Sequence, residues 1–231
     1  MRVDTHPVYI LDLDGTILRT NSFPYWVLFL ARAPFPSMDW KQRLKTSGTV
    51  VAMLAGRKLH IIDHEHFKWR LQQLWRRVTG GNDMVAQRFA ERLIAHVRPE
   101  MGPVLKMVAT GRIDAVMATA APADYAQRLG RTLGFRHIIA TPGTRSFGEP
   151  SNMGEQKRKA VMEFLLRNGW HHRPRVVFTD HRDDLPLIGI CRRVYWFGSE
   201  QDGREIARAA YCESIRFGLR PVRSPSSFAA T

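Results

Sequence analysis

The chain has 231 residues, of which 44% are hydrophobic, enough for one large domain or for a core with an inserted module. Its first residues lack the apolar stretch of a signal peptide, and no run approaches the roughly 18 apolar residues of a membrane span, so we expect a soluble protein. Its two cysteines argue against a disulfide framework and favour a cytoplasmic setting. The net charge of +14 favours anionic partners, whether phosphorylated metabolites, nucleic acid or lipid.

The first predicted element is a strand at residues 8–11, Val-Tyr-Ile-Leu, which is apolar throughout, as in parallel sheets covered on both faces. Asp12 and Asp14 follow it, and Gly15 permits a tight exit. Two acids so close together resist joint ionisation unless they share a cation or a proton. The pair therefore indicates a metal site or an acid/base centre; an Asx turn that caps the next helix is the simpler alternative, but it needs only one Asp.

About eighty residues with helical spacing of apolar positions separate this strand from the next. Helices are predicted within 25–32, 40–54 and 64–78, with breaks at 34–36, 47–49 and 79–82. A helical block of this length inside an α/β pattern predicts a cap inserted after the first strand.

From Pro99 onward, strands and helices alternate with short turns, which predicts a doubly wound, Rossmann-like parallel sheet. The strands are expected at 113–119, 137–140, 174–179 and 193–197, and the helices at 101–109, 122–133 and 154–168. We expect an α/β core of residues 1–20 and 98–220, an α-helical cap of residues 21–97, and a tail of residues 221–231 without regular structure.

Two further residues stand where predicted elements begin or end. Thr119 closes an apolar run, which would leave its hydroxyl and nearby backbone N–H groups beside Asp12, an arrangement that binds phosphate. An ordinary N-cap is the alternative for Thr119. Lys157 lies near the start of a predicted helix, where the helix dipole disfavours a cation. Its alternative is an exposed lysine without a role.

The strand predicted at 174–179 ends in a second group of acids, Asp180, Asp183 and Asp184. Ligands bind at the carboxyl ends of strands in open α/β sheets. Two strand ends that carry acids and face one crevice make an oxygen-ligand site suited to Mg²⁺.

Taken together, these residues resemble the haloacid dehalogenase (HAD) superfamily, specifically its phosphoserine-phosphatase-like branch with a helical cap in the first insertion position. The resemblance spans nearly the whole chain, because its motifs occur in the family's order. They are Asp-Leu-Asp-Gly-Thr at 12–16, the strand ending in Thr119, Lys157, and Asp180 with Asp184.

The resemblance implies that Asp12 is a nucleophile that forms an aspartyl-phosphate, which water then hydrolyses. It implies that Asp14 protonates the leaving group and later deprotonates the water. The side chains of Asp12 and Asp180 and the backbone carbonyl of Asp14 would hold Mg²⁺, and Asp184 would support the metal directly or through water. Thr119 and Lys157 would bind the transferring oxygens. Because family members that act on haloacids lack an acid two residues after the nucleophile, Asp14 favours phosphate-ester hydrolysis.

The chain departs from this branch at some positions. Residues 119–122 read Thr-Ala-Ala-Pro where phosphoserine phosphatases usually carry Ser-Gly-Gly, and no Glu follows the Gly-Thr turn closely enough to receive an amino group, so phosphoserine is disfavoured. His181, Arg182 and Asp183 replace the usual small residues. We expect Arg182 to pair with Asp183; recognition of a second anionic group is the alternative.

The predicted cap carries +7, half of the chain's charge in a third of its length. Its first helix, near residues 23–30, is apolar nearly all round, which favours packing against the core over contact with a membrane surface. His60, Asp63 and His64 have metal-ligand spacing, but nothing nearby completes a site, which favours a surface helix.

The sequence thus predicts a Mg²⁺-dependent phosphatase that acts on a small phosphorylated metabolite through an aspartyl-phosphate. The alternatives are a lipid-phosphate phosphatase at a membrane surface, and a non-catalytic basic protein that binds nucleic acid or anionic membrane. Peripheral contact with anionic lipid stays open, and we expect no stable nucleic-acid partner.

Overall fold

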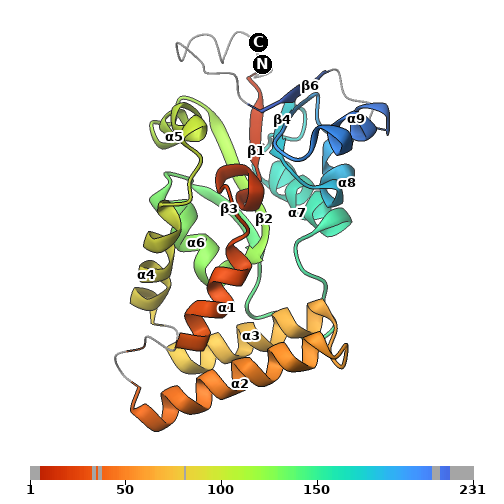
Figure 1. The fold of residues 1–231 in the computed structure, drawn as a ribbon. Coiled ribbons are helices and arrows are strands. Elements are labelled where there is room, and N and C mark those ends of the chain that lie inside the picture. Colours follow the sequence, from red (N-terminus) through yellow and green to blue (C-terminus); the bar gives the residue numbers. More distant parts are fainter. Residues whose placement is uncertain (1–5, 33–34, 36–37, 81, 210–213, 219–231) are drawn as a thin grey trace.

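The computed structural model describes residues 6–32, 35, 38–80, 82–209 and 214–218. Six parallel strands form one sheet in the order β3-β2-β1-β4-β5-β6 (Figure 1). The strands are β1 (Val8–Leu11), β2 (Asp114–Pro122), β3 (His137–Thr141), β4 (Arg175–Thr179), β5 (Arg193–Trp196) and β6 (Ser214–Phe217). The chain leaves β1 toward β2 and β3 on one side and later returns to β4 on the other, so the carboxyl end of β1 lies at the switch point of the sheet.

The all-apolar sequence of β1 is explained by its position, since it pairs with β2 on one side and β4 on the other. Its four residues are all buried. Because side chains alternate along a strand, Tyr9 and Leu11 enter the hydrophobic cluster on one face of the sheet, and Val8 and Ile10 enter the cluster on the other face. The first predicted strand and the parallel α/β class are confirmed.

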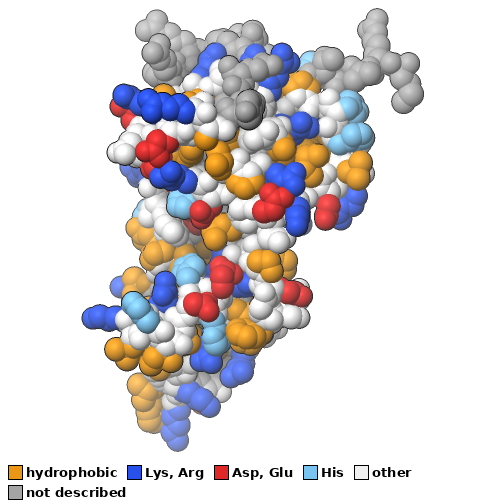
Figure 2. Space-filling view, turned by 90° about the vertical axis from the view of Figure 1, so that its right-hand side faces the viewer, with side chains coloured by type: hydrophobic (Ala, Val, Ile, Leu, Met, Phe, Trp, Pro, Cys, Tyr) orange, Lys and Arg blue, Asp and Glu red, His pale blue; other side chains and the backbone are white. Residues whose placement is uncertain are grey.

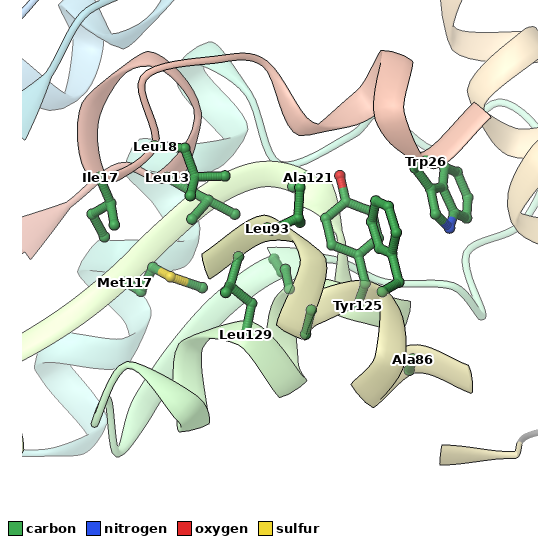
Figure 3. Packing of buried hydrophobic residues seen from close by; sticks show 14 of the residues in the cluster. Leu13, Ile17, Leu18, Trp26, Ala86, Leu93, Met117, Ala121, Tyr125 and Leu129 are labelled. Atoms are coloured by element: carbon green, nitrogen blue, oxygen red, sulfur yellow. The ribbon is translucent and has the colours of Figure 1, made fainter. Parts of the chain in front are cut away.

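Helices cover both faces of the sheet (Figure 1). On one face lie α5 (Gly102–Ala109) and α6 (Ala123–Thr132), and on the other lie α7 (Gly154–Arg167), α8 (Leu185–Ile188) and α9 (Glu200–Ala209). Figure 3 shows the core on the α6 face, where Leu129 lies near Met117 of β2 and Tyr125 lies near Ala121. The predicted helices 101–109, 122–133 and 154–168 each correspond to a helix here, whereas the sequence did not predict α9 and β6.

Four helices follow the β1 loop: α1 (Ser22–Arg32), α2 (Trp40–Lys58), α3 (His64–Thr79) and α4 (Asp83–Ile94). Of these, α2 and α3 extend beyond the carboxyl ends of the strands and lie furthest from the sheet (Figure 1). The break predicted at 47–49 is wrong, because α2 runs through it without interruption. Gly48 and Ser47 do not end the helix, since the Ser47 hydroxyl donates to the Arg43 and Ala31 carbonyls and joins α2 to α1. The sequence predicted no separate helix at α4, which packs beside α6.

The helix predicted near residues 23–30 packs against the core, which is the alternative that the sequence favoured. Trp26, Phe29 and Leu30 of α1 are buried, and the Trp26 ring lies beside Tyr125 of α6 (Figure 3). Asp63 is the N-cap of α3 and accepts a hydrogen bond from the His66 backbone N–H, so its carboxylate has a structural role. This agrees with the surface-helix interpretation of the His60, Asp63 and His64 group.

The division into core and cap at residues 20 and 98 stays a prediction. The predicted tail at 221–231 lies outside the described residues. Across the described ranges, no helix is both long enough and apolar enough to cross a membrane.

Candidate active site

The loop that follows β1 presents two carboxylates at the switch point of the sheet. Asp12 has extended backbone angles, and the next residues form a tight turn over Leu13–Ile17. Gly15 adopts a φ of 70°, which a residue with a side chain would reach only with strain. The Arg98 guanidinium donates two hydrogen bonds to the Gly15 carbonyl, at 3.2 and 2.8 Å, and so holds the turn in place.

Lys157 joins Asp12 to Asp184 within the buried floor of this site. Its Nζ lies 2.9 Å from Asp12 Oδ1 and 2.7 Å from Asp184 Oδ1. Asp184 Oδ2 also accepts a hydrogen bond of 2.6 Å from the Thr179 hydroxyl at the end of β4. Lys157 is 3% exposed, so the alternative of an ordinary surface lysine is wrong. Near the start of α7 this cation is stabilised by two carboxylates, which offset the unfavourable helix dipole.

Burial sets the proton affinities in this cluster. Burial raises the pKa of Asp12 to about 8, even though the neighbouring Lys157 acts to lower it. Burial alone would lower the pKa of Lys157, but Asp12 and Asp184 raise it above its usual value. The positive charge of Lys157 therefore does not fully compensate the negative charges of Asp12 and Asp184. Additional positive charge would favour the ionised form of Asp12.

Asp14 lies on the other side of the loop and faces the inserted helices. Its Oδ1 accepts a hydrogen bond of 2.7 Å from the Ser22 backbone N–H at the start of α1. The Ser22 hydroxyl is in turn hydrogen-bonded to the Tyr125 hydroxyl at 2.6 Å. Burial raises the pKa of Asp14 to about 6, with the Ser22 hydrogen bond opposing the shift. A carboxyl group with this pKa can both donate and accept a proton near neutral pH.

Asp180 packs directly over the Gly15 turn. Its Oδ1 accepts a hydrogen bond of 3.3 Å from the Thr16 hydroxyl, and burial raises its pKa. A Cβ atom added to Gly15 would lie 1.8 Å from Asp180 Oδ2. The missing side chain of Gly15 is therefore what allows the Asp180 carboxylate to approach the loop that carries Asp12 and Asp14.

We expect Gly15→Ala to lower kcat/KM by about a hundredfold, because the added methyl group displaces Asp180 from the Asp12 loop. The measurement is steady-state hydrolysis of an aryl phosphate with Mg²⁺ present, the activity that the sequence predicts. Gly148→Ala is the matched control, since Gly148 also has a positive φ, of 88°, but its Cβ would meet nothing within 4 Å. Equal activity losses in both variants would contradict the role assigned to the Gly15 and Asp180 contact.

Thr119 lies within β2, at the edge that faces Asp12. Its hydroxyl accepts a hydrogen bond of 3.0 Å from the Ala121 backbone N–H. The Asn152 side chain donates to the Thr119 carbonyl, and the Thr141 hydroxyl donates to the Ala120 carbonyl, which fixes this stretch of backbone. The N-cap alternative for Thr119 is wrong, because α6 begins at Ala123 with Pro122 as its N-cap.

The site opens into a cavity of about 570 Å³ between the strand ends and the inserted helices. All six residues predicted from the sequence line it: Asp12, Asp14, Thr119, Lys157, Asp180 and Asp184. The sequence analysis missed Lys68 of α3, which is 5% exposed and donates a hydrogen bond of 2.5 Å to the Ala120 carbonyl. Burial lowers the pKa of Lys68 to about 8. Lys68 lies four residues after His64 on the same face of α3, and both side chains line the cavity.

A polar network attaches α3 to the loop that follows β3. The buried Arg145 guanidinium donates to the side chains of Gln72 and Glu65, at 3.2 and 3.0 Å. Glu65 also accepts hydrogen bonds from the backbone and the hydroxyl of Ser151. Although burial acts to raise it, the pKa of Glu65 is lowered, chiefly by the Ser151 hydrogen bond. The network thus holds α3, and Lys68 with it, over the cavity.

The expected pair between Arg182 and Asp183 is wrong. The Arg182 guanidinium instead contacts Asp202 at 3.3 Å and Glu205 at 2.9 Å, both on α9. Asp183 contacts His181 at 3.2 Å. The side chains of Arg182 and Asp183 point in different directions because both residues lie on a short helical turn, Arg182–Asp184.

The donor set suits Mg²⁺, which prefers oxygen ligands and usually keeps several waters beside one or two protein carboxylates. Asp12 and Asp180 offer such carboxylates, and because burial raises the pKa of both, a bound cation would favour their ionised forms. Within the ranges that the structure describes, no three His, Cys, Asp or Glu side chains gather as a metal cage. Both oxygens of Asp184 contact Lys157, which leaves a two-carboxylate site as the arrangement that fits.

An acidic centre at the switch point of a parallel sheet, covered by inserted helices, defines an α/β enzyme. Residues 9–188 match the haloacid dehalogenase-like hydrolase family, so the chain belongs to this family, and the predicted superfamily and hydrolase class are confirmed. No curated protein matches the sequence significantly.

Solved structures share the fold. A protein of unknown function from Bordetella pertussis Tohama I is 19% identical and has a TM-score of 0.71, covering 92% of this chain and 99% of its own. A HAD family hydrolase from Salmonella enterica serovar Typhi is 12% identical, with a TM-score of 0.55 and coverage of 91% and 68%. A phospho-aspartyl intermediate analogue of phosphoserine phosphatase is 11% identical, with a TM-score of 0.51 and coverage of 97% and 99%. The fold is therefore also that of phosphoserine phosphatases.

Proposed function

We propose that the protein is a Mg²⁺-dependent phosphatase that hydrolyses a small phosphate monoester through an aspartyl-phosphate at Asp12. The observation that carries this proposal is the Asp12, Lys157 and Asp184 contact at the switch point of the sheet, at 2.9 and 2.7 Å. It places a carboxylate nucleophile beside a fixed cation that can bind a phosphoryl oxygen. The haloacid dehalogenase-like family, and the fold shared with phosphoserine phosphatase, support the same class.

In the first step, a carboxylate oxygen of Asp12 attacks phosphorus, and the bond between phosphorus and the leaving oxygen breaks. Asp14 donates its proton to that oxygen. In the second step, Asp14 accepts a proton from water as the water attacks phosphorus, and the bond to Asp12 breaks to release phosphate. The pKa of Asp14 near 6 suits both roles.

The remaining residues bind and orient the phosphoryl group. The Thr119 side chain lines the same cavity as Asp12, and its hydroxyl can donate to a phosphoryl oxygen. Asp184 and Thr179 fix the position of Lys157. Asp12, Asp180 and the Asp14 carbonyl would hold Mg²⁺, which supplies charge that neutralises the developing negative charge of the transferring phosphoryl group. The two cysteines are in keeping with a reducing compartment, and we place the enzyme in the cytoplasm.

Metal dependence tests this proposal. We expect hydrolysis of p-nitrophenyl phosphate with Mg²⁺, loss of activity with chelator, and recovery when Mg²⁺ is restored. Asp180→Asn should raise the Mg²⁺ concentration for half-maximal activity by about tenfold to a hundredfold, because it removes one charged ligand. Asp183→Asn is the control, since Asp183 contacts His181 and lies outside the proposed ligand set.

Several outcomes would count against the phosphatase. Activity that persists fully in chelator would show that the reaction needs no metal. If the Asp180 and Asp183 variants changed the Mg²⁺ concentration for half-maximal activity equally, Asp180 would not be the proposed ligand. No hydrolysis of any phosphate monoester in a broad panel, together with salt-sensitive binding to DNA, would favour the non-catalytic alternative.

A further inference from the structure

The helix α2 is an exposed element at the end of the molecule furthest from the sheet (Figure 1). Only two of its nineteen residues, Thr46 and Val50, are buried. These lie on the side that packs against α1 and α3. Twelve of the nineteen residues are exposed, so most of the helix surface is open to solvent, and its composition is not explained by the core.

An apolar stripe runs along the open surface of α2. Trp40, Leu44, Val51 and Leu54 are 69%, 66%, 59% and 42% exposed. At about 100° per residue, these four side chains fall within about 40° of one line along the helix. Of the fifteen large hydrophobic side chains exposed in the described part of the chain, six lie between residues 40 and 61, the other two being Leu59 and Ile61. Apolar side chains gathered in this way mark an interaction surface.

The same helix carries five basic residues and no acidic residue. Lys41, Lys45 and Lys58 are exposed, whereas Arg43 donates to the carbonyls of the preceding segment. Figure 2 shows hydrophobic and basic side chains together at the lower end of the molecule, where α2 lies in Figure 1. The open side of α2 is thus apolar along its stripe, with Lys41 and Lys45 to one side of the stripe and Lys58 at its C-terminal end.

We propose that this face of α2, with the turn that contains Leu59 and Ile61, docks onto an anionic lipid surface. A helix of this kind lies in the plane of the interface, with its apolar stripe among the acyl chains and its basic residues near the headgroups. Trp40 stands at one end of the stripe, and aromatic rings of this type favour the interface. A second copy is the less suitable occupant, because two such faces would bring like charges together.

The proposed lipid-docking face lies on α2 and not on the first helix, for which the sequence left membrane contact as an alternative. Residues 23–30 belong to α1, whose Trp26, Phe29 and Leu30 are buried in the core. The lipid surface that the structure supports is therefore on α2. Docking through α2 would leave the catalytic residues on the far side of α3, so it is independent of the chemistry proposed above.

Vesicle co-sedimentation of the full chain tests the docking. We expect binding to vesicles of 70% phosphatidylcholine and 30% phosphatidylglycerol, and weak binding to pure phosphatidylcholine. Leu44→Gln/Val51→Gln/Leu54→Gln should lower the partition coefficient by about tenfold or more, because apolar burial is lost. Lys41→Gln/Lys45→Gln/Lys58→Gln should lower it by about a hundredfold at low salt. Hydrolysis of p-nitrophenyl phosphate without vesicles should stay unchanged in both variants.

Control variants on other surfaces test whether vesicle binding depends on this face of α2 or only on the total charge and hydrophobicity of the protein. Met84→Gln/Leu166→Gln removes exposed apolar side chains elsewhere, and Lys106→Gln/Lys159→Gln/Arg167→Gln removes the same charge elsewhere. Both should bind nearly as well as the unchanged protein. Equal losses in the control variants, or no binding to anionic vesicles, would overturn the proposal. A dimer in solution that the Leu44, Val51 and Leu54 variant dissociates would assign the face to a second copy instead.

Discussion

Asp12→Asn is expected to lower kcat for aryl phosphate hydrolysis by about 10⁴-fold or more, because the amide cannot act as the nucleophile. Asn has nearly the same shape as Asp, so the turn over Leu13–Ile17 and the packing of β1 should persist. The measurement is phosphate release at saturating substrate and Mg²⁺. Asp83→Asn, at an exposed acid on α4, is the control and should retain full activity.

The same variant makes a thermodynamic prediction. Because the folded-state pKa of Asp12, about 8, exceeds the ordinary 3.8, the folded metal-free protein binds more protons than the unfolded chain between these pH values. The stability that Asp12 contributes is therefore complete below pH 4 and is lost as the pH rises toward 8. Asp12→Asn should flatten this decline in thermal denaturation without metal. Turnover that survives the substitution, in a correctly folded protein, would sink the proposed nucleophile.

Residues whose roles follow from local patterns were found in the sequence. The strand before Asp12 is apolar at every position, so its end and the two acids beyond it could be located without a structure. Thr119 and Asp180 follow similar apolar runs, and parallel strands bring such ends to one edge of the sheet. The six candidate residues therefore line one cavity because the topology that brings them there has a strong local signal.

Residues whose roles depend on distant partners were missed. Arg182 contacts acids of α9 about twenty positions away, and nothing in its own neighbourhood predicts that helix as its partner. Lys68 reads as one of many surface cations in a basic cap, but the packing of α3 on the Thr119 edge buries it. The break predicted near Gly48 failed for a similar reason, because contacts with α1 and α3 override a weak local helix propensity.

The network between α3 and the loop after β3 connects the covering helices to the proposed catalytic residues. Gln72 and Glu65 of α3 bind Arg145 at one end of this loop, and Ser151 and Asn152 follow at the other end. Asn152 then donates to the Thr119 carbonyl, just before α7 begins and carries Lys157. Hydrogen bonds thus link α3 to the Thr119 backbone, and the segment of Ser151 and Asn152 leads directly into the helix that carries Lys157.

Lys157→Met should have the largest effect on stability. It leaves the Asp12 and Asp184 carboxylates, 8% and 2% exposed, without the cation between them. Removing one partner from a buried ionic cluster costs about 3–5 kcal/mol. The free energy of unfolding, measured in urea without metal at pH 9, above the Asp12 pKa of about 8, should fall by this amount. With Mg²⁺ present, kcat should fall by about a thousandfold. Lys159→Met, two residues further along α7 and exposed, should change neither quantity.

A second substitution separates the two effects of losing Lys157. Asp184→Asn added to Lys157→Met removes one of the uncompensated charges, so stability should partly recover, whereas activity should not, because the phosphoryl group still lacks its cation. Lowering the pH should also reduce the stability loss of Lys157→Met, since a protonated Asp12 no longer needs a counterion and its folded-state pKa is already raised. A stability loss that depends neither on pH nor on Asp184 would show that Lys157 acts through packing of its aliphatic chain. The charges of Asp12 and Asp184 would then be compensated by other groups.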